Sequence, residues 1–165
     1  MKHHAYIGLG SNLQSPALQL ESALQNIGQI PHCRLLVCSP FYGSKAIGPG
    51  QQPDYVNAVA LLQCDLPAME LLHQLQRIEL EQGRERGPEQ WVPRTLDLDI
   101  LLFDRQVIDT ERLQIPHPRL QQRNFVLKPL FDLAPDLVLP DGKAVVDLLK
   151  TTGTQGLWQL PDLSS

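Results

Sequence analysis

Within the stretch PRTLDLDILLFD at residues 93–104, two carboxylates lie two residues apart in the otherwise apolar run LDLDILLF at 96–103. Asp97 and Asp99 alternate there with aliphatic residues, which predicts a β-strand with both acids on one face, about 6.5 Å apart. The opposite face is predicted to point into the core and consists of Leu96, Leu98, Ile100 and Leu102. Two carboxylates facing one point repel each other unless a cation or a proton lies between them. The pair is therefore a candidate Mg²⁺ site, because Mg²⁺ binds one or two carboxylates together with substrate phosphates. An exposed strand face with two incidental acids is the alternative.

Arginine is concentrated around this stretch. Eight of the 14 basic residues lie between positions 77 and 123, and all eight are arginine. Arg94 lies three residues before Asp97, and Arg84 and Arg86 lie just upstream. A metal to bridge phosphates and guanidinium groups to meet growing negative charge are what phosphoryl transfer requires. No Walker-type G-x-x-x-x-G-K-[ST] motif occurs, so any ATP would be held by side chains and metal. Solvated surface charge is the alternative for any single arginine.

Two further groups could contact a nucleotide or a heterocycle. His117 lies between Pro116 and Pro118 and is followed by Arg119 and Arg123, which makes it a candidate phosphate contact, with a structural histidine as the alternative. Tyr55 and Asn57 share one face of a predicted strand. An aromatic ring beside an amide, which both donates and accepts, can hold a flat heterocycle.

The bulk composition limits the classes of function. The net charge of −4 gives no basic field that would recruit nucleic acid or an anionic membrane. Cys33, Cys38 and Cys64 lack zinc-like spacing and are predicted to be reduced, half-buried thiols. The absence of a long apolar run and of a signal-peptide pattern predicts a soluble, cytoplasmic protein. We expect residues 1–165 to form a single domain, with 151–165 as a loose tail.

The order of predicted elements is β-α-β-β-α-β with further elements appended, which indicates an α+β sandwich on a mainly antiparallel sheet. The G-x-G of IGLGSN is predicted as a tight exit from the first strand, because a lone G-x-G is a weak phosphate-binding signal. The predicted strands are about 4–9, 34–42, 55–63, 93–104 and 107–108, and the predicted helices are 15–28, 67–83, 125–133 and 145–150.

These segments together resemble the 6-hydroxymethyl-7,8-dihydropterin pyrophosphokinase family of folate biosynthesis. The resemblance is carried by four runs: YIGLGSNL at 6–13, SPFYGSKAIGPGQQPDYVNAV at 39–59, QRIELEQGRERGPEQWVPRTLDLDILLFD at 76–104 and IPHPRLQQRNFVLKPLFDLAPD at 115–136. It implies a three-layer α-β-α sandwich with a ferredoxin-like core. It also implies transfer of the β,γ-pyrophosphoryl group of ATP to the pterin hydroxymethyl oxygen, with release of AMP, by a monomer.

The resemblance assigns a role to each candidate residue. Asp97 and Asp99 bind two Mg²⁺ ions that straddle the triphosphate, and Arg84 and Arg94 close over ATP. The further ATP contacts that it implies are Gln76, Ile100, Arg112, His117 and Arg123. The pterin contacts that it implies are Ser44, Ile47, Tyr55, Asn57, Trp91 and Phe125, with Tyr55 and Phe125 on the two ring faces, Asn57 at the edge and Trp91 sealing the pocket.

The chain departs from the family pattern in two places. GSKAIG at 43–48 stands where some members carry a proline pair, and Pro118 stands where some carry an aromatic residue. Two other functions stay open from the residues alone. One is a metal-dependent nucleotidyltransferase that uses the same D-x-D and releases pyrophosphate. The other is a ferredoxin-like module that binds RNA or a small ligand without catalysis, which the negative charge and the lack of an aromatic RNA-binding strand disfavour.

Overall fold

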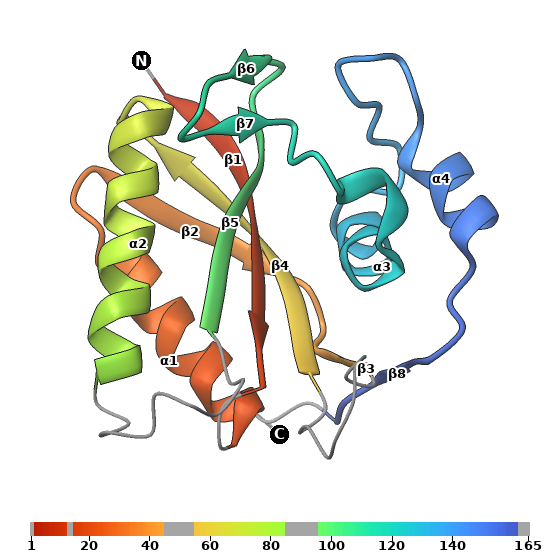
Figure 1. Cartoon of the computed structure of the whole chain (residues 1–165), viewed down its shortest axis with the longest axis horizontal. Coiled ribbons are helices and arrows are strands. Elements are labelled where there is room, and N and C mark those ends of the chain that lie inside the picture. The colour runs from red at the N-terminus through yellow and green to blue at the C-terminus, as the bar shows by residue number, and fades with distance from the viewer. Residues whose placement is uncertain (1, 13–14, 45–54, 85–95, 162–165) are drawn as a thin grey trace.

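The computed structural model describes residues 2–12, 15–44, 55–84 and 96–161 (Figure 1). A six-stranded sheet lies at its centre, with the strand order β5-β1-β4-β3-β8 and with β2 also paired to β4. The strands of this sheet are β1 (His3–Ser11), β2 (Cys33–Cys38), β3 (Tyr42–Ser44), β4 (Tyr55–Cys64), β5 (Leu96–Phe103) and β8 (Leu157–Gln159). Their pairings are antiparallel. β6 (Ile108–Asp109) and β7 (Gln114–Ile115) form a separate two-stranded sheet.

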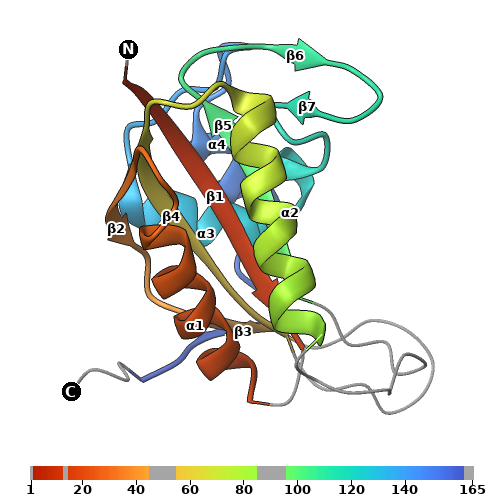
Figure 2. The same ribbon diagram turned by 90° about the vertical axis from the view of Figure 1, so that its left-hand side faces the viewer.

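Helices cover both faces of the central sheet. α1 (Pro16–Gly28) and α2 (Ala68–Arg84) lie on one face, and α3 (Asn124–Leu133) and α4 (Val145–Thr152) lie on the other (Figures 1 and 2). The predicted α+β class, the α-β-α layers and the mainly antiparallel sheet are therefore confirmed. No helix in the described part of the chain is long and apolar enough to cross a membrane.

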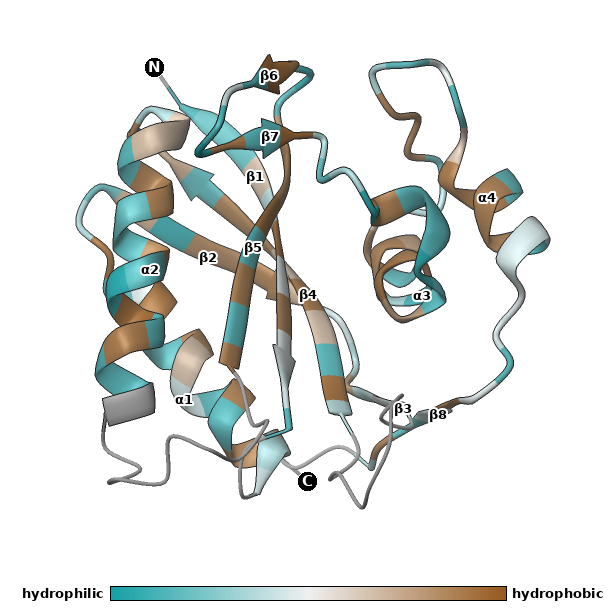
Figure 3. Ribbon diagram, viewed as in Figure 1, coloured by the Kyte–Doolittle hydropathy of each residue, from teal (hydrophilic) through white to brown (hydrophobic). Residues whose placement is uncertain are grey.

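Two apolar cores follow from these layers. Alternation along β1 buries Ala5, Ile7 and Leu9 against α1 and α2. The helices contribute the facing stripes Leu20, Ala23 and Ile27 on α1 and Leu71, Leu75 and Ile78 on α2. The second core joins the other face of the sheet to α3 and α4 and includes Val59, Leu101, Leu102, Leu127, Leu130 and Val145. Figure 3 shows the corresponding apolar residues along the strands and in stripes on the helices. Each fully buried aliphatic side chain contributes about 1.5–3 kcal/mol, so the sheet is rigidly held on both sides.

A bulge in β5 corrects one sequence prediction. Tyr6 pairs with Leu102, whereas Ile7 pairs with Ile100, so Leu101 is an extra residue. An extra residue reverses the alternation of side chains beyond it. Leu96, Leu98 and Ile100 pack toward α1 and α2 as predicted, but Leu102 lies in the core on the α3 side. The prediction that Leu102 faces the same way as Leu98 is wrong because sequence alternation does not reveal the bulge.

The predicted strand at 34–42 is two strands. β2 and β3 follow one another along the same edge of β4. Between them, the Ser39 hydroxyl accepts a hydrogen bond from the backbone N–H of Val59 at 3.0 Å and donates to the carbonyl of Pro40 at 2.8 Å. Because proline has no N–H to donate, a continuous ladder ends here.

The prediction of a loose tail at 151–165 is wrong for residues 157–159. These residues form β8, which pairs with β3 in the register Gly43 to Trp158. A Cβ built on Gly43 would lie 2.3 Å from Cε2 of Trp158, so the indole ring packs directly on the glycine backbone. The C-terminal segment therefore completes one edge of the central sheet (Figure 1).

Candidate active site

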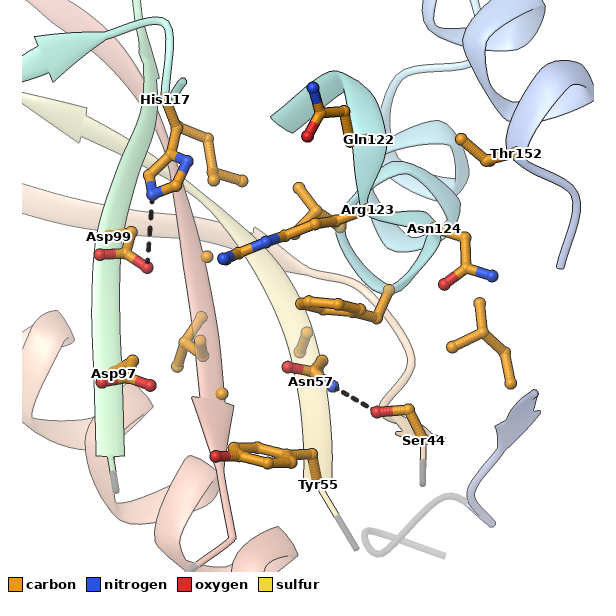
Figure 4. A pocket seen from close by; sticks show the side chains of 18 of the residues that line it. Ser44, Tyr55, Asn57, Asp97, Asp99, His117, Gln122, Arg123, Asn124 and Thr152 are labelled. Carbon is orange, nitrogen blue, oxygen red and sulfur yellow. Dashed lines mark hydrogen bonds and ion pairs between the residues drawn. The ribbon is translucent and has the colours of Figure 1, made fainter. Parts of the chain in front are cut away.

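A cavity of about 720 Å³ opens between the central sheet and the start of α3 (Figure 4). Its walls come from β1, β4 and β5, from the residues around His117, from α3 and from the C-terminal segment. Eight of the residues proposed from the sequence line it: Ser44, Tyr55, Asn57, Asp97, Asp99, His117, Arg123 and Phe125. The structure thus brings together residues that lie up to 81 positions apart in the sequence.

The two carboxylates point to the same side of β5, as the alternation predicted (Figure 4). Asp97 is exposed and Asp99 is half-buried. Both line the cavity, on the face opposite to the buried Leu96 and Leu98. The apolar face of the strand therefore fixes the direction in which both acids point.

The floor beside these acids is made of glycine. On β1, Gly10 is the direct partner of Asp97 and Gly8 is the direct partner of Asp99. A Cβ on Gly10 would lie 2.7 Å from Oδ1 of Asn57, so any side chain at this position would displace the Asn57 amide. The G-x-G of YIGLGSN therefore lies inside β1, and the prediction that it forms a turn after the strand is wrong. Glycines two residues apart leave one face of a strand without side chains, and here that face also carries the acids. This spacing was the sequence signal for the open floor, and sequence reasoning did not use it.

A third carboxylate lies on the other side of β5. Oε2 of Glu79, on α2, accepts a hydrogen bond from the backbone N–H of Leu98 at 2.7 Å. Burial raises the pKa of Glu79 to about 7; the Leu98 N–H opposes that change, and the charges of Asp97 and Asp99 add to it. The sequence pattern gave no sign of this contact.

The donor set fits a hard divalent cation. The described residues include no group of three or more His, Cys, Asp or Glu side chains that could hold a metal by themselves. Two carboxylates beside an open glycine floor suit Mg²⁺, which completes its oxygen ligands with water and substrate phosphates rather than with a full protein cage.

His117 is held with one ring nitrogen toward the cavity. Its Nδ1 accepts a hydrogen bond from the backbone N–H of Arg119 at 3.2 Å, and the backbone N–H of His117 donates to the carbonyl of Leu101 at 3.0 Å. Its Nε2 lies 4.0 Å from Oδ2 of Asp99. Burial lowers the pKa of His117, and Arg123 and Arg119 lower it further, against the opposing effect of Asp99. The neutral ring with Nδ1 as acceptor therefore carries its proton on Nε2, as a donor directed at the cavity.

The opposite end of the cavity is aromatic. Tyr55 and Asn57 extend from β4 and Phe125 from the first turn of α3. Asn57 is 7% exposed, and its Nδ2 donates to Oγ of Ser44 at 3.2 Å (Figure 4). The guanidinium carbon of Arg123 lies 5.5 Å from the centre of the Phe125 ring, a cation–π distance. The cavity thus joins an acidic end to an end with aromatic rings and a fixed amide.

The remaining predicted residues do not line this cavity or lie outside the described residues. Gln76 is exposed on α2, Ile100 is buried in the core beneath β5, and Arg112 is exposed between β6 and β7. Ile47, Trp91 and Arg94 lie outside the described residues. Arg84 is the last residue of α2, and its side chain is not described.

The C-terminal segment supplies cavity residues that sequence reasoning missed. These are Thr152, Gln155, Gly156 and Leu157, which join Gln122 and Asn124 near α3. Nδ2 of Asn124 donates to the carbonyl of Gln155 at 3.1 Å and so links the segment to the start of α3. No motif marks residues 152–157, because their part in the cavity depends on the pairing of β8 with β3.

Comparisons with known proteins agree with this site. The family model described as 7,8-dihydro-6-hydroxymethylpterin-pyrophosphokinase (HPPK) matches residues 6–135. The chain is 50% identical over 161 residues to the 2-amino-4-hydroxy-6-hydroxymethyldihydropteridine pyrophosphokinase of Pseudomonas aeruginosa, covering 98% of this chain and 99% of that protein. It is 52% identical over 146 residues to the enzyme of the same name from Haemophilus influenzae, covering 88% of this chain and 91% of that protein.

Among solved structures, Plasmodium falciparum HPPK-DHPS with pteroate has a TM-score of 0.69 at 13% identity. The likeness covers 92% of this chain and 42% of that one, so this chain spans less than half of that protein. At this identity the likeness concerns the fold alone. The residues that the family model matches include Asp97, Asp99, His117 and Phe125 of the cavity, whereas the cavity residues of the C-terminal segment lie beyond the match. The chain belongs to the 7,8-dihydro-6-hydroxymethylpterin-pyrophosphokinase family.

Proposed function

We propose that this chain transfers the β,γ-pyrophosphoryl group of ATP to the hydroxymethyl oxygen of 6-hydroxymethyl-7,8-dihydropterin, releasing AMP, as a step of folate biosynthesis. Family membership supports this activity. The single structural observation that carries it is the cavity itself, which joins a pair of carboxylates on a bare glycine floor to an aromatic end with a fixed amide.

At the acidic end, Asp97 and Asp99 would hold Mg²⁺. The family resemblance implies that two ions bind there. The metal supplies Lewis-acid stabilisation of negative charge on the phosphates. Arg123 extends from the start of α3 toward the strands (Figure 4), and its planar guanidinium suits bidentate contact with phosphate oxygens. The Nε2–H of His117 is a further hydrogen-bond donor to these phosphate oxygens. A neutral histidine can donate this hydrogen bond without adding a fixed positive charge next to the metal site.

At the aromatic end, Tyr55 and Phe125 would contact the two faces of the pterin ring. Asn57 gives one of its amide hydrogens to Ser44, which leaves the second hydrogen and Oδ1 for the edge of the heterocycle. An amide held by a fixed partner discriminates a ring with complementary donors and acceptors, because a ligand without them leaves buried polar groups unpaired.

Further assignments rest on the family resemblance. We place Arg84 and Arg94 over the transferring phosphates, Gln76, Ile100 and Arg112 at the nucleotide, and Ile47 and Trp91 at the pterin. Residues 1–165 would act as a single domain and a monomer, and the protein would work in the cytoplasm.

The proposal is tested by incubating the protein with ATP, Mg²⁺ and 6-hydroxymethyl-7,8-dihydropterin and separating the nucleotide products. We expect AMP and the pterin diphosphate in equal amounts, and no AMP without the pterin. ADP as the product would contradict pyrophosphoryl transfer. Release of pyrophosphate would favour the nucleotidyltransferase alternative, and salt-dependent affinity for RNA with no turnover would favour the binding module.

A further inference from the structure

Two of the three cysteines lie opposite one another at the end of the sheet away from the cavity. Cys33 begins β2 and Cys64 ends β4, and the two are direct partners in the antiparallel ladder. Tyr55, at the cavity, is the first residue of the ten-residue β4, so Cys64 lies about 30 Å along the strand from it. Neither cysteine lines the cavity.

Their geometry suits a covalent link. Directly opposite residues of an antiparallel pair have Cα atoms about 4.5–5.5 Å apart, which falls within the range of about 4.4–6.8 Å that a disulfide spans. The two Sγ atoms are 2.7 Å apart, so the side chains face each other. Both cysteines are free thiols in the structure. Closing a disulfide therefore requires no rearrangement of the backbone.

The third cysteine offers an internal comparison. Cys38 pairs with Ala60 across the same two strands, and its thiol contacts the carbonyl of Ser39 at 3.3 Å. It is half-buried, as is Cys33, but no cysteine lies opposite it.

The surroundings hold the two cysteines in place and bury them to different extents. Cys64 is 1% exposed within the core, and its sulfur accepts a hydrogen bond from the backbone N–H of Leu66 at 3.3 Å. The N–H of Asp65 donates to the carbonyl of His32 at 2.9 Å, which holds the chain next to both cysteines. Cys33 is half-buried at the edge of the core, whereas Cys64 is fully buried, so Cys33 is the residue that a small reagent would meet first. Burial and the neighbouring Cys64 thiol raise the pKa of Cys33, so the Cys33 thiol must first lose its proton to solvent before its sulfur can attack.

We propose that Cys33 and Cys64 are a reversible oxidation site, at which a low-molecular-weight disulfide closes a cross-strand disulfide between β2 and β4. The Cys33 thiolate attacks one sulfur of the reagent, forms a mixed disulfide and expels one reagent thiolate. The Cys64 thiolate then attacks the Cys33 sulfur and expels the second. Two protein thiols are oxidised and one reagent disulfide is reduced, and the two cysteine protons pass through solvent to the two expelled thiolates, which become thiols.

The link would stabilise the outer part of the sheet. β2 pairs only with β4 among the described strands, so it depends on that single ladder. The disulfide would close a loop from residue 33 to residue 64, which contains β2, β3 and β4. Closing this loop reduces the conformational freedom of the unfolded chain. For a chain of this size we expect the melting temperature to rise by about 5–10 °C.

The test treats the full-length protein with oxidised glutathione and counts free thiols after denaturation, with peptide mapping under non-reducing conditions. We expect the count to fall from three to one without a retained glutathione, a peptide that joins Cys33 to Cys64, and reversal by dithiothreitol. Cys38→Ser should still form the link and show the same rise in melting temperature. Cys33→Ser should show neither, while its AMP-forming activity when reduced equals that of the unchanged protein.

Other results overturn the proposal. These are retention of all three thiols, a stable glutathione adduct on Cys33 with no link, or equal loss of thiols in Cys33→Ser and the unchanged protein. A link that involves Cys38 would also overturn it. Because the readouts are thiols, peptides and melting temperature, they do not depend on the proposed catalytic activity.

Discussion

Replacing Gly10 with alanine tests whether the glycine floor holds the amide of Asn57 in place. The added Cβ would lie 2.7 Å from Oδ1 of Asn57, and a shift of about 0.7 Å is needed to restore ordinary contact at 3.4 Å. The hydrogen bond from Asn57 to Ser44 is already 3.2 Å long, at the upper end of the normal range. The amide therefore cannot move by that amount and keep both its partner and its aim at the heterocycle.

The size of the effect follows from the hydrogen bonds at risk. Leaving a buried polar group without its partner costs about 1–3 kcal/mol, which corresponds to about a 5- to 150-fold rise in KM for the pterin. The assay measures AMP release at saturating ATP and Mg²⁺ with the pterin varied. Gly8→Ala is the matched control, because its Cβ would meet only the flexible end of the Leu101 side chain at 3.2 Å. We expect its effect on KM to be several-fold smaller.

A double variant isolates the route of the effect. If Gly10→Ala acts through Asn57, then adding Gly10→Ala to Asn57→Ala should raise KM little beyond the value of Asn57→Ala alone. Full additivity of the two changes would refute the reasoning, because the alanine would then act on the substrate directly. An unchanged KM in a folded Gly10→Ala protein would refute it as well.

Three further changes probe the metal site and the packing around the cavity. Asp97→Asn removes a charge from an exposed side chain, so we expect kcat to fall by about 10²-fold or more while the melting temperature stays within about 2 °C; a large loss of stability would contradict a role at the site. Gly43→Ala places a Cβ 2.3 Å from the Trp158 ring and should therefore detach β8 from β3. A lower melting temperature and faster digestion by carboxypeptidase would report this detachment. Unchanged digestion would contradict the packing of Trp158 on Gly43. Tyr42→Phe removes the hydrogen bond from the Tyr42 hydroxyl to Asp132. It should lower the melting temperature by about 4 °C. An equal effect in Asp132→Ala would support the loss of that contact as the cause.

The direction of the two acids was predictable from the sequence, because alternation on a strand is a local property. Leu96 and Leu98 are buried and Asp97 and Asp99 line the cavity, as the period-2 pattern requires. The convergence of His117, Arg123 and Phe125 on these acids was not a local property. It depends on how the chain after β5 folds back over the sheet, and only the family resemblance brought it into the prediction.

The errors have physical causes that no single stretch of sequence reveals. A bulge at Leu101 reverses the side chains beyond it, and it is visible only in the register against Tyr6 and Ile7. The pairing of β8 with β3 joins residues 113–117 positions apart. A three-residue edge strand has too little pattern to be distinguished from a loop.

β5 shows how one strand serves two different requirements. Its first half must present charge on one face and apolar residues on the other, and strict alternation from Leu96 to Ile100 does this. Its second half lies between two cores, so both faces must be apolar, and the bulge at Leu101 places residues in both. Since the backbone N–H of Leu98 faces away from β1, it also needs a partner at the sheet edge, which Glu79 supplies. The acids are therefore held by packing below them, by the glycines beside them and by a hydrogen bond to the strand between them. This arrangement accounts for two like charges on a strand whose opposite face is buried.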